Sequence, residues 1–295
     1  MKHLLKLFAL IVVLQSCNSC EVEPVKKRLT YQNIIILSDM SDRISNKNFS
    51  NKDFLEIQKL LKYFETECVK PGEKIGDRSS LYFSTFSDKS SVSINLDDLK
   101  TLGEKQSFIN STGKYQKSGL KQKLIDFELS VANKYANTKD LGLDLLSVLI
   151  EKISNGNLIK KDKIITDGID STIIHYENHI YIFTDGYLEY STKTKNSQFR
   201  FGLPEIRKAR MNCVGRNLNI EQVIVNDPSL SLRPVKKNEH KLVDLHVLET
   251  HERDFDKAKH TYENPIGLRD NEILEAVWKK WAEESEFKSL VWSKY

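Results

Sequence analysis

The stretch NIIILSDMSDRIS, residues 33–45, constrains the fold more than any other part of the chain. Its run of aliphatic residues from Ile34 to Leu37 predicts a strand buried on both faces, as in the middle of a parallel sheet. Asp39 and Ser41 follow directly after this strand. Because ligands of open α/β sheets bind just beyond the carboxyl ends of the strands, we expect these two side chains at a functional edge.

Strand and helix patterns alternate along the rest of the chain, which indicates a doubly wound α/β fold with a mostly parallel sheet. Residues 79–96 contain two short strand patterns around a turn, and this predicts an antiparallel hairpin at one edge of the sheet. Residues 97–118 look irregular, and the polar connections 226–240 and 250–270 have no assigned structure. The remaining expected helices are 51–68, 119–136, 141–154, 203–211 and 271–287, and the remaining expected strands are 179–184, 219–225 and 240–249.

The N-terminal segment MKHLLKLFALIVVLQSC has the pattern of a secretory signal. Lysines precede an apolar run from Leu7 to Leu14, which is too short to span a membrane. The tetrad LQSC resembles the lipobox of bacterial lipoproteins, which implies a signal peptide of residues 1–16 and a lipid on Cys17. Such a lipid anchors a protein to a membrane without spanning it. The alternative is an ordinary signal peptide with Cys17 beside its cleavage site.

The residues after the signal have the pattern of one folded domain, and the signal predicts that this domain lies outside the cytoplasm. Residues 17–32 are polar and aperiodic, so we expect a lipidated tether there, followed by a single domain with a C-terminal helix over residues 33–295. The net charge is only +4, from 45 basic and 41 acidic residues that alternate along the sequence. This pattern gives no basic face for a nucleic-acid partner. We therefore expect a lipid-anchored, extracytoplasmic protein of the cell envelope.

Oxygen-bearing side chains in three segments predict a metal site. Asp39 and Ser41 follow the first strand, Thr138 precedes a helix in NTKDLG, and Asp185 ends the strand in HIYIFTDG. Loops at the carboxyl edge of one sheet can bring these groups together. Mg²⁺ prefers oxygen ligands in octahedral geometry and keeps several waters, which leaves room for a partner's carboxylate.

This order of motifs resembles the von Willebrand factor type A (vWA) family over most of residues 33–190. DMSDR, NTKDLG and FTDG match the family's metal-ion-dependent adhesion site, and LYFSTFSDKSSVSINL is similar to its edge hairpin. The resemblance implies a vWA or Rossmann-like α/β fold and a Mg²⁺ ion held by Asp39, Ser41, Thr138 and Asp185.

Arg43 stands where the family's D-x-S-x-S motif has its second serine. A guanidinium cannot ligate a cation and brings a positive charge to the site. Either the metal is retained with fewer protein ligands and Arg43 turns outward, or Arg43 pairs with Asp39 or Asp185 and takes the place of the cation. Asp42 and Ser45 are candidate substitute ligands outside the family's positions.

Simpler structural roles compete with this interpretation. Asp39 and Ser41 are residue types that cap helices, but capping does not explain why Thr138 and Asp185 occur in the same order as in the family. Asp167, in the similar stretch IITDG, follows a shorter run flanked by lysines and is expected in a surface turn.

Five further residues have structural explanations. His246, Glu249 and His251 are candidate metal ligands by residue type, but strand alternation places the two histidines on opposite faces, so we expect solvent-exposed residues at a strand end instead. Trp278 and Trp281 are expected to anchor the terminal helix in the core.

The cysteines do not form a recognisable framework. Cys68 and Cys213 follow helical patterns and are expected to be buried, and their spacing gives no support for a bridge between them.

Three functions remain open on the sequence. The first is a binding module that recognises a protein partner through the candidate Mg²⁺ site. The second is a metal-free envelope scaffold with Arg43 in place of the cation. The third is a Mg²⁺-dependent phosphoryl-transfer enzyme with Asp39 as nucleophile, although Asp39-Met40-Ser41 lacks the second carboxylate that such enzymes carry.

Overall fold

The structure, a computed structural model, describes residues 26–73, 76–88, 90–138, 142–155, 157–167, 170–190, 198–249 and 251–294. The predicted signal peptide and the predicted lipidation site, Cys17, lie outside these ranges. The chain divides into a small unit, residues 1–29 and 162–174, and a large unit, residues 30–161 and 175–295. Within the described ranges, no helix has both the length and the apolar composition needed to cross a membrane.

The small unit contains a hairpin. Strand β4 (Lys163–Asp167) pairs antiparallel with the first residues of β5 (Asp170–Thr184), and Asp167 lies opposite Asp170. The stretch IITDG, expected as a surface turn, therefore contributes a strand that ends at Asp167. The first residues of β1 (Lys26–Ser38) also belong to this unit, so residues 26–32, expected in the tether before a domain that starts near Asn33, are part of a strand.

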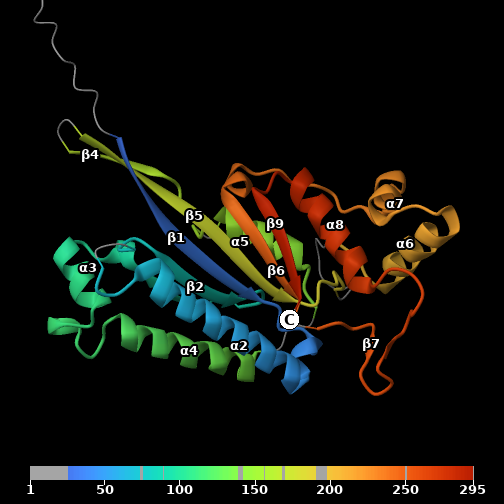
Figure 1. Cartoon of the computed structure of the whole chain (residues 1–295), viewed down its shortest axis with the longest axis horizontal. Coiled ribbons are helices and arrows are strands. Elements are labelled where there is room, and N and C mark those ends of the chain that lie inside the picture. Colours follow the sequence, from blue (N-terminus) through green and yellow to red (C-terminus); the bar gives the residue numbers. More distant parts are fainter. Residues whose placement is uncertain are drawn as a thin grey trace, which may run out of the picture. The chain divides into compact units, whose positions relative to one another are not determined.

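The sheet of the large unit has the strand order β3-β2-β1-β5-β6-β9 (Figure 1). Strand β2 (Ser80–Thr85) runs parallel to β1, β6 (Val243–Glu249) runs parallel to β5, and β9 (Ser289–Lys294) runs parallel to β6. Strand β3 (Val92–Asn95) runs antiparallel to β2. Asn33 contacts Asn178 and Asp39 contacts Phe183, so β1 and β5 also run in the same direction. The expected fold class is confirmed: a mostly parallel, Rossmann-like α/β sheet with an antiparallel edge hairpin.

Helices cover both faces of this sheet (Figure 1). On one face lie α2 (Lys47–Tyr63), α3 (Leu102–Ile109) and α4 (Leu120–Asn137). On the other lie α5 (Leu145–Asn155), α6 (Leu203–Arg216), α7 (Ile220–Asn226) and α8 (Asp270–Glu284).

The first strand is buried on both faces, as its sequence predicts. Ile34 and Ile36 pack into the core on the side of α2 and α4, whereas Ile35 and Leu37 pack on the side of α5 and α8. The side chains in both cores are almost fully inaccessible. This packing fixes the direction of β1 and therefore the position at which Asp39 leaves the sheet.

Several sequence predictions of local structure were wrong. Residues 219–225 form the helix α7 rather than a strand, because Ile220, Val223 and Ile224 have helical spacing and all three are buried. Residues 97–118 contain α3, and a last strand, β9, follows the C-terminal helix. Helix α2 starts at Lys47 with Asn46 as its cap, four residues before the expected start at Asn51.

The side chains expected in the interior are found there. Trp278 and Trp281 are almost completely buried in the core beneath α8. Cys68 and Cys213 are buried and free, so no bridge joins them.

The connection from 250 to 270, which had no assigned structure, carries a small hairpin of β7 (Phe255–Asp256) and β8 (Thr261–Tyr262). It begins at the carboxyl end of β6, at the same edge of the sheet as Asp39. This position allows its side chains to reach the candidate site.

Candidate functional site

The carboxyl ends of β1 and β5 meet at Asp39. The backbone N–H of Asp39 donates a hydrogen bond to the carbonyl of Phe183 at 2.9 Å. The Asp39 carboxylate accepts one hydrogen bond from the backbone N–H of Ser41 at 2.9 Å and another from the Thr184 hydroxyl at 3.1 Å. Burial raises the pKa of Asp39; the nearby Arg43 charge opposes this shift, and the Asp185 charge adds to it. The segments that carry Asp39 and Asp185 therefore lie together, as predicted.

Asp185 is paired with an arginine that the sequence analysis did not identify. Nε of Arg253 donates to the Asp185 carboxylate at 2.7 Å, and Nη1 of Arg253 donates to Glu189 at 2.7 Å. The guanidinium also lies over the ring of Tyr187, 4.1 Å from its centre. Asp185 is 1% exposed, so its charge is neutralised within the protein and not by water. No sequence pattern marks Arg253, because it lies in an irregular connection.

Arg43 forms a second buried ion pair, with Asp53 of α2. Its two terminal nitrogens donate to the two carboxylate oxygens of Asp53 at 3.1 and 2.6 Å, and Nη2 also donates to the carbonyl of Phe183 at 3.0 Å. Tyr135 of α4 donates its hydroxyl to Asp53 at 2.9 Å. Neither interpretation of Arg43 describes this arrangement: the guanidinium points into the protein, but its carboxylate partner is neither Asp39 nor Asp185.

Thr138 lies at the same edge of the sheet as Asp39. It follows α4 directly, and its backbone N–H bonds to the carbonyl of Lys134. One turn earlier, the hydroxyl of Tyr135 lies 2.8 Å from the hydroxyl of Ser38, the last residue of β1. The end of α4 is thus next to the end of β1. The structure shows no hydrogen bond of the Thr138 side chain to another described residue, and residues 139–141 are outside the described ranges.

Ser41 and the two candidate substitute ligands sit on the turn after β1. Ser41 is partly buried and precedes a short 3₁₀ turn, Asp42–Ser45, without capping it through its side chain. Asp42 and Ser45 are exposed. Capping of the following helix is done by Asn46, so the alternative role of Asp39 and Ser41 as caps of α2 is not found.

The arrangement of these groups does not fit a Mg²⁺ ion. Mg²⁺ requires carboxylate oxygens directed at one point in near-octahedral geometry. Here one oxygen of Asp185 pairs with the Arg253 guanidinium, and both oxygens of Asp39 accept hydrogen bonds. The positive charge that balances the buried carboxylates comes from Arg43 and Arg253.

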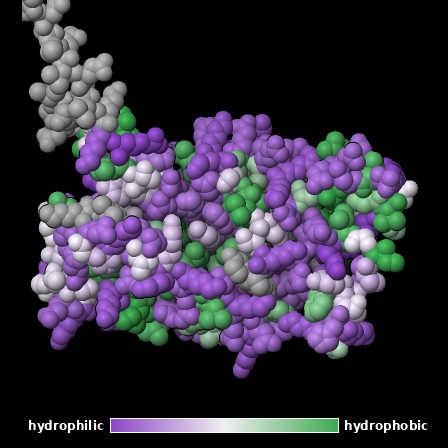
Figure 2. All heavy atoms as spheres, in the orientation of Figure 1, coloured by the Kyte–Doolittle hydropathy of each residue, from purple (hydrophilic) through white to green (hydrophobic). Residues whose placement is uncertain are grey.

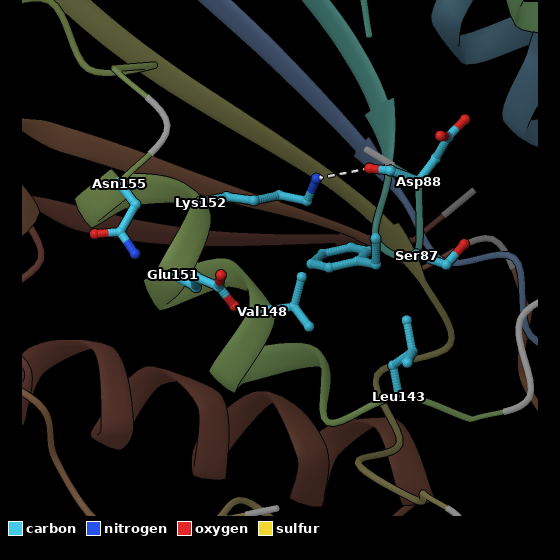
Figure 3. Close-up of a pocket in the computed structure, with 8 residues that line it drawn as sticks. Ser87, Asp88, Leu143, Val148, Glu151, Lys152 and Asn155 are labelled. Carbon is cyan, nitrogen blue, oxygen red and sulfur yellow. Dashed lines mark hydrogen bonds between the residues drawn. The ribbon is translucent and has the colours of Figure 1, made fainter. Parts of the chain in front are cut away.

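A recess of about 360 Å³ lies beside this edge, at the end of β2 (Figure 3). Phe86, whose backbone N–H bonds to the carbonyl of Ser38, forms one apolar wall. The ammonium of Lys152 reaches across the recess to the carbonyl of Asp88 at 3.3 Å (Figure 3), and burial lowers the pKa of Lys152. An apolar wall with one ammonium group can hold an apolar side chain that carries a nearby acceptor oxygen.

A second cavity, of about 240 Å³, lies at the carboxyl end of β6. Burial raises the pKa of Glu249 in its wall to about 7, although Trp292 donates a hydrogen bond to that carboxylate at 3.0 Å. Glu249 is 3% exposed, and His251 stacks on Phe49 of α2 with ring centres 3.7 Å apart, so the expectation that both are solvent-exposed is wrong. This contact joins the connection after β6 to the first turn of α2.

No protein-family model matches the chain, and no curated protein sequence matches it. The resemblance to vWA domains therefore rests on the order of the sequence motifs alone.

Proposed function

We propose that this chain is a membrane-anchored, extracytoplasmic vWA-like binding module that recognises a protein partner at the carboxyl edge of its sheet without a metal ion. The observation that carries the proposal is the pairing of Arg253 with Asp185. Where the family would place a cation beside this aspartate, the chain supplies a guanidinium from its own loop.

Arg253 has the properties of a residue that contacts a partner. Asp185, Glu189 and Tyr187 hold its side chain in place, yet 33% of that side chain is exposed. Arginine is enriched among the residues that dominate binding energy at protein interfaces. A side chain that is already fixed loses little conformational entropy when a partner binds. Arg253 therefore presents a preorganised positive charge to a partner's carboxylate or carbonyl oxygen.

Arg43 has a different role, because its side chain is only 1% exposed. It cannot contact a partner without breaking its pair with Asp53. In the metal-free scaffold suggested by the sequence, Arg43 takes the place of the cation. We propose instead that Arg43 stabilises the interior and that Arg253 contacts the partner.

The surface agrees with a protein that binds partners through local sites. In Figure 2 the visible face is mostly polar, and its apolar residues form small, separate patches. The proposed anchor is the lipid on Cys17, which the tetrad LQSC supports.

Site-specific photo-crosslinking in cells tests the proposal. A photoreactive residue at the exposed position Asp42, beside the site, should yield a discrete adduct, whereas one at the exposed position Lys100, at the opposite edge of the sheet, should not. Arg253→Ala should remove the Asp42 adduct, and a chelator should leave it unchanged. Equal adducts from both positions, or an adduct that disappears with chelator, would contradict the proposal.

A further inference from the structure

Two histidines meet on neighbouring strands of the large unit, away from the site described above. His179 lies on β5 and His246 on β6, two positions apart in the parallel register, since His179 is opposite Asp244 and His246 is opposite Tyr181. Nδ1 of His179 lies 3.1 Å from Nε2 of His246. A single proton shared between the two rings accounts for this distance in the protein alone.

The same distance is the separation of two ligands on one metal ion. Imidazole nitrogens bind Zn²⁺ at about 2.0 to 2.1 Å, so two of them on one ion lie about 2.8 to 3.4 Å apart for angles near 90 to 110°. The observed 3.1 Å falls within this interval. The two nitrogens can therefore keep their separation when a metal ion binds, while the rings turn so that both lone pairs point at the ion.

Neighbouring aromatic rings hold the pair in place. His246 stacks on Tyr181 with ring centres 4.4 Å apart. The ring centres of His179 and His246 lie 5.3 Å apart, and the ring planes are inclined by 44° to each other.

The face of the sheet is open to solvent at this point. On the other side of His246, the opposite residue in β9 is Val291, which is 46% exposed. An ion could therefore reach the pair from solvent. Asp244 is close by, but Lys288 and Ser289 occupy its carboxylate oxygens.

We propose that His179 and His246 form a binding site for a divalent transition-metal ion such as Zn²⁺ or Ni²⁺. Imidazole suits these ions, whereas Mg²⁺ prefers oxygen ligands. Because the described residues place no group of three or more His, Cys, Asp or Glu side chains together, water completes the coordination. This site is independent of the proposed function at Asp39 and Asp185.

Calorimetric titration of the metal-stripped full chain with ZnCl₂ and NiCl₂ tests the proposal. We expect saturable binding at one ion per chain that His179→Gln or His246→Gln each weakens by at least about tenfold, since one ligand alone lacks the gain of an intramolecular second contact. The double variant lacks both ligands and should bind at least as weakly as the weaker single variant. His175→Gln, on the same strand four residues before His179, is the matched control and should bind as the wild type does.

Thermal unfolding separates loss of binding from loss of folding. A bound ion stabilises only the folded state, so Zn²⁺ should raise the Tm of the wild type and of His175→Gln but not of the two site variants. If the wild type shows no saturable binding, or if folded His179→Gln and His246→Gln bind as tightly as the wild type, the pair is an imidazole hydrogen bond and not a metal site.

Discussion

Nη2 of Arg43 lies 2.6 Å from a carboxylate oxygen of Asp53, and both side chains are almost completely buried. This pair joins the turn after β1 to α2. Removing one partner of a buried pair leaves an unpaired charge in the interior, which typically costs about 3 to 5 kcal/mol. We therefore expect Arg43→Met and Asp53→Asn each to lower the free energy of unfolding strongly in urea denaturation.

The double variant Arg43→Met/Asp53→Leu should recover much of this loss, because no unpaired charge remains and apolar side chains can fill the space. Asp126→Asn, at an exposed carboxylate of α4, is the control and should change stability little. Equal stability of Asp53→Asn and Asp126→Asn would show that the buried pair is not formed in solution.

Arg253→Gln should destabilise the protein less than the Arg43 variants do. It leaves the buried carboxylate of Asp185 without its cation, but Arg253 itself is partly exposed and water can replace part of the contact. A loss of about 1 to 3 kcal/mol is expected for a buried polar group left without its partner. Urea denaturation measures this loss in the free energy of unfolding. Arg207→Gln, at an exposed arginine, is the control and should be clearly more stable than Arg253→Gln.

Glu249 should make stability depend on pH. Its pKa in the folded protein is raised by burial to about 7, above its ordinary value of 4.5. The folded state therefore holds a proton that the unfolded state releases, and the resulting stabilisation is complete below about pH 4.5 and lost as the pH rises to about 7. Glu249→Gln does not titrate, so it should be more stable relative to the wild type at pH 8 than at pH 5.

Urea denaturation of the wild type and of Glu249→Gln at pH 5 and pH 8 measures this difference in the free energy of unfolding. The exposed Glu221→Gln should show no comparable change between pH 5 and pH 8. A Glu249→Gln effect that is the same at both pH values would mean that the carboxyl group titrates normally in the folded protein.

The predicted lipid anchor can be tested directly. Cys17→Ala should release the protein from the membrane or leave its signal peptide uncleaved, because the predicted lipid is attached to this thiol. Detergent phase partitioning and gel mobility report both effects. A variant that partitions and migrates as the wild type does would rule out lipidation at Cys17.

The sequence predicts most of the sheet because its signals are local. The aliphatic run from Ile34 to Leu37 and the apolar run from Ile180 to Phe183 identify two adjacent central strands, and the residues that follow them locate the edge. Short apolar patterns fit both the helical period and the strand period, and there the prediction from sequence fails. Residues 220–225, predicted as a strand, form a helix.

The composition of the site could be predicted only in part. Asp39 and Asp185 come directly after strands, so the topology brings their segments together. Asp53 and Arg253 depend on tertiary contacts instead: one is a buried carboxylate within a helix, and the other lies in a connection without a pattern. No local rule pairs residues that are 68 positions apart, as Asp185 and Arg253 are.

Isothermal titration of the wild-type chain with MgCl₂ tests most directly whether the Arg253 guanidinium replaces the cation at Asp185. The account predicts no saturable binding heat, and none for Arg43→Ser, because Arg253 still occupies Asp185 in that variant. Saturable binding of one ion per chain by the wild type, lost in Asp185→Asn, would contradict it and restore the metal-dependent site.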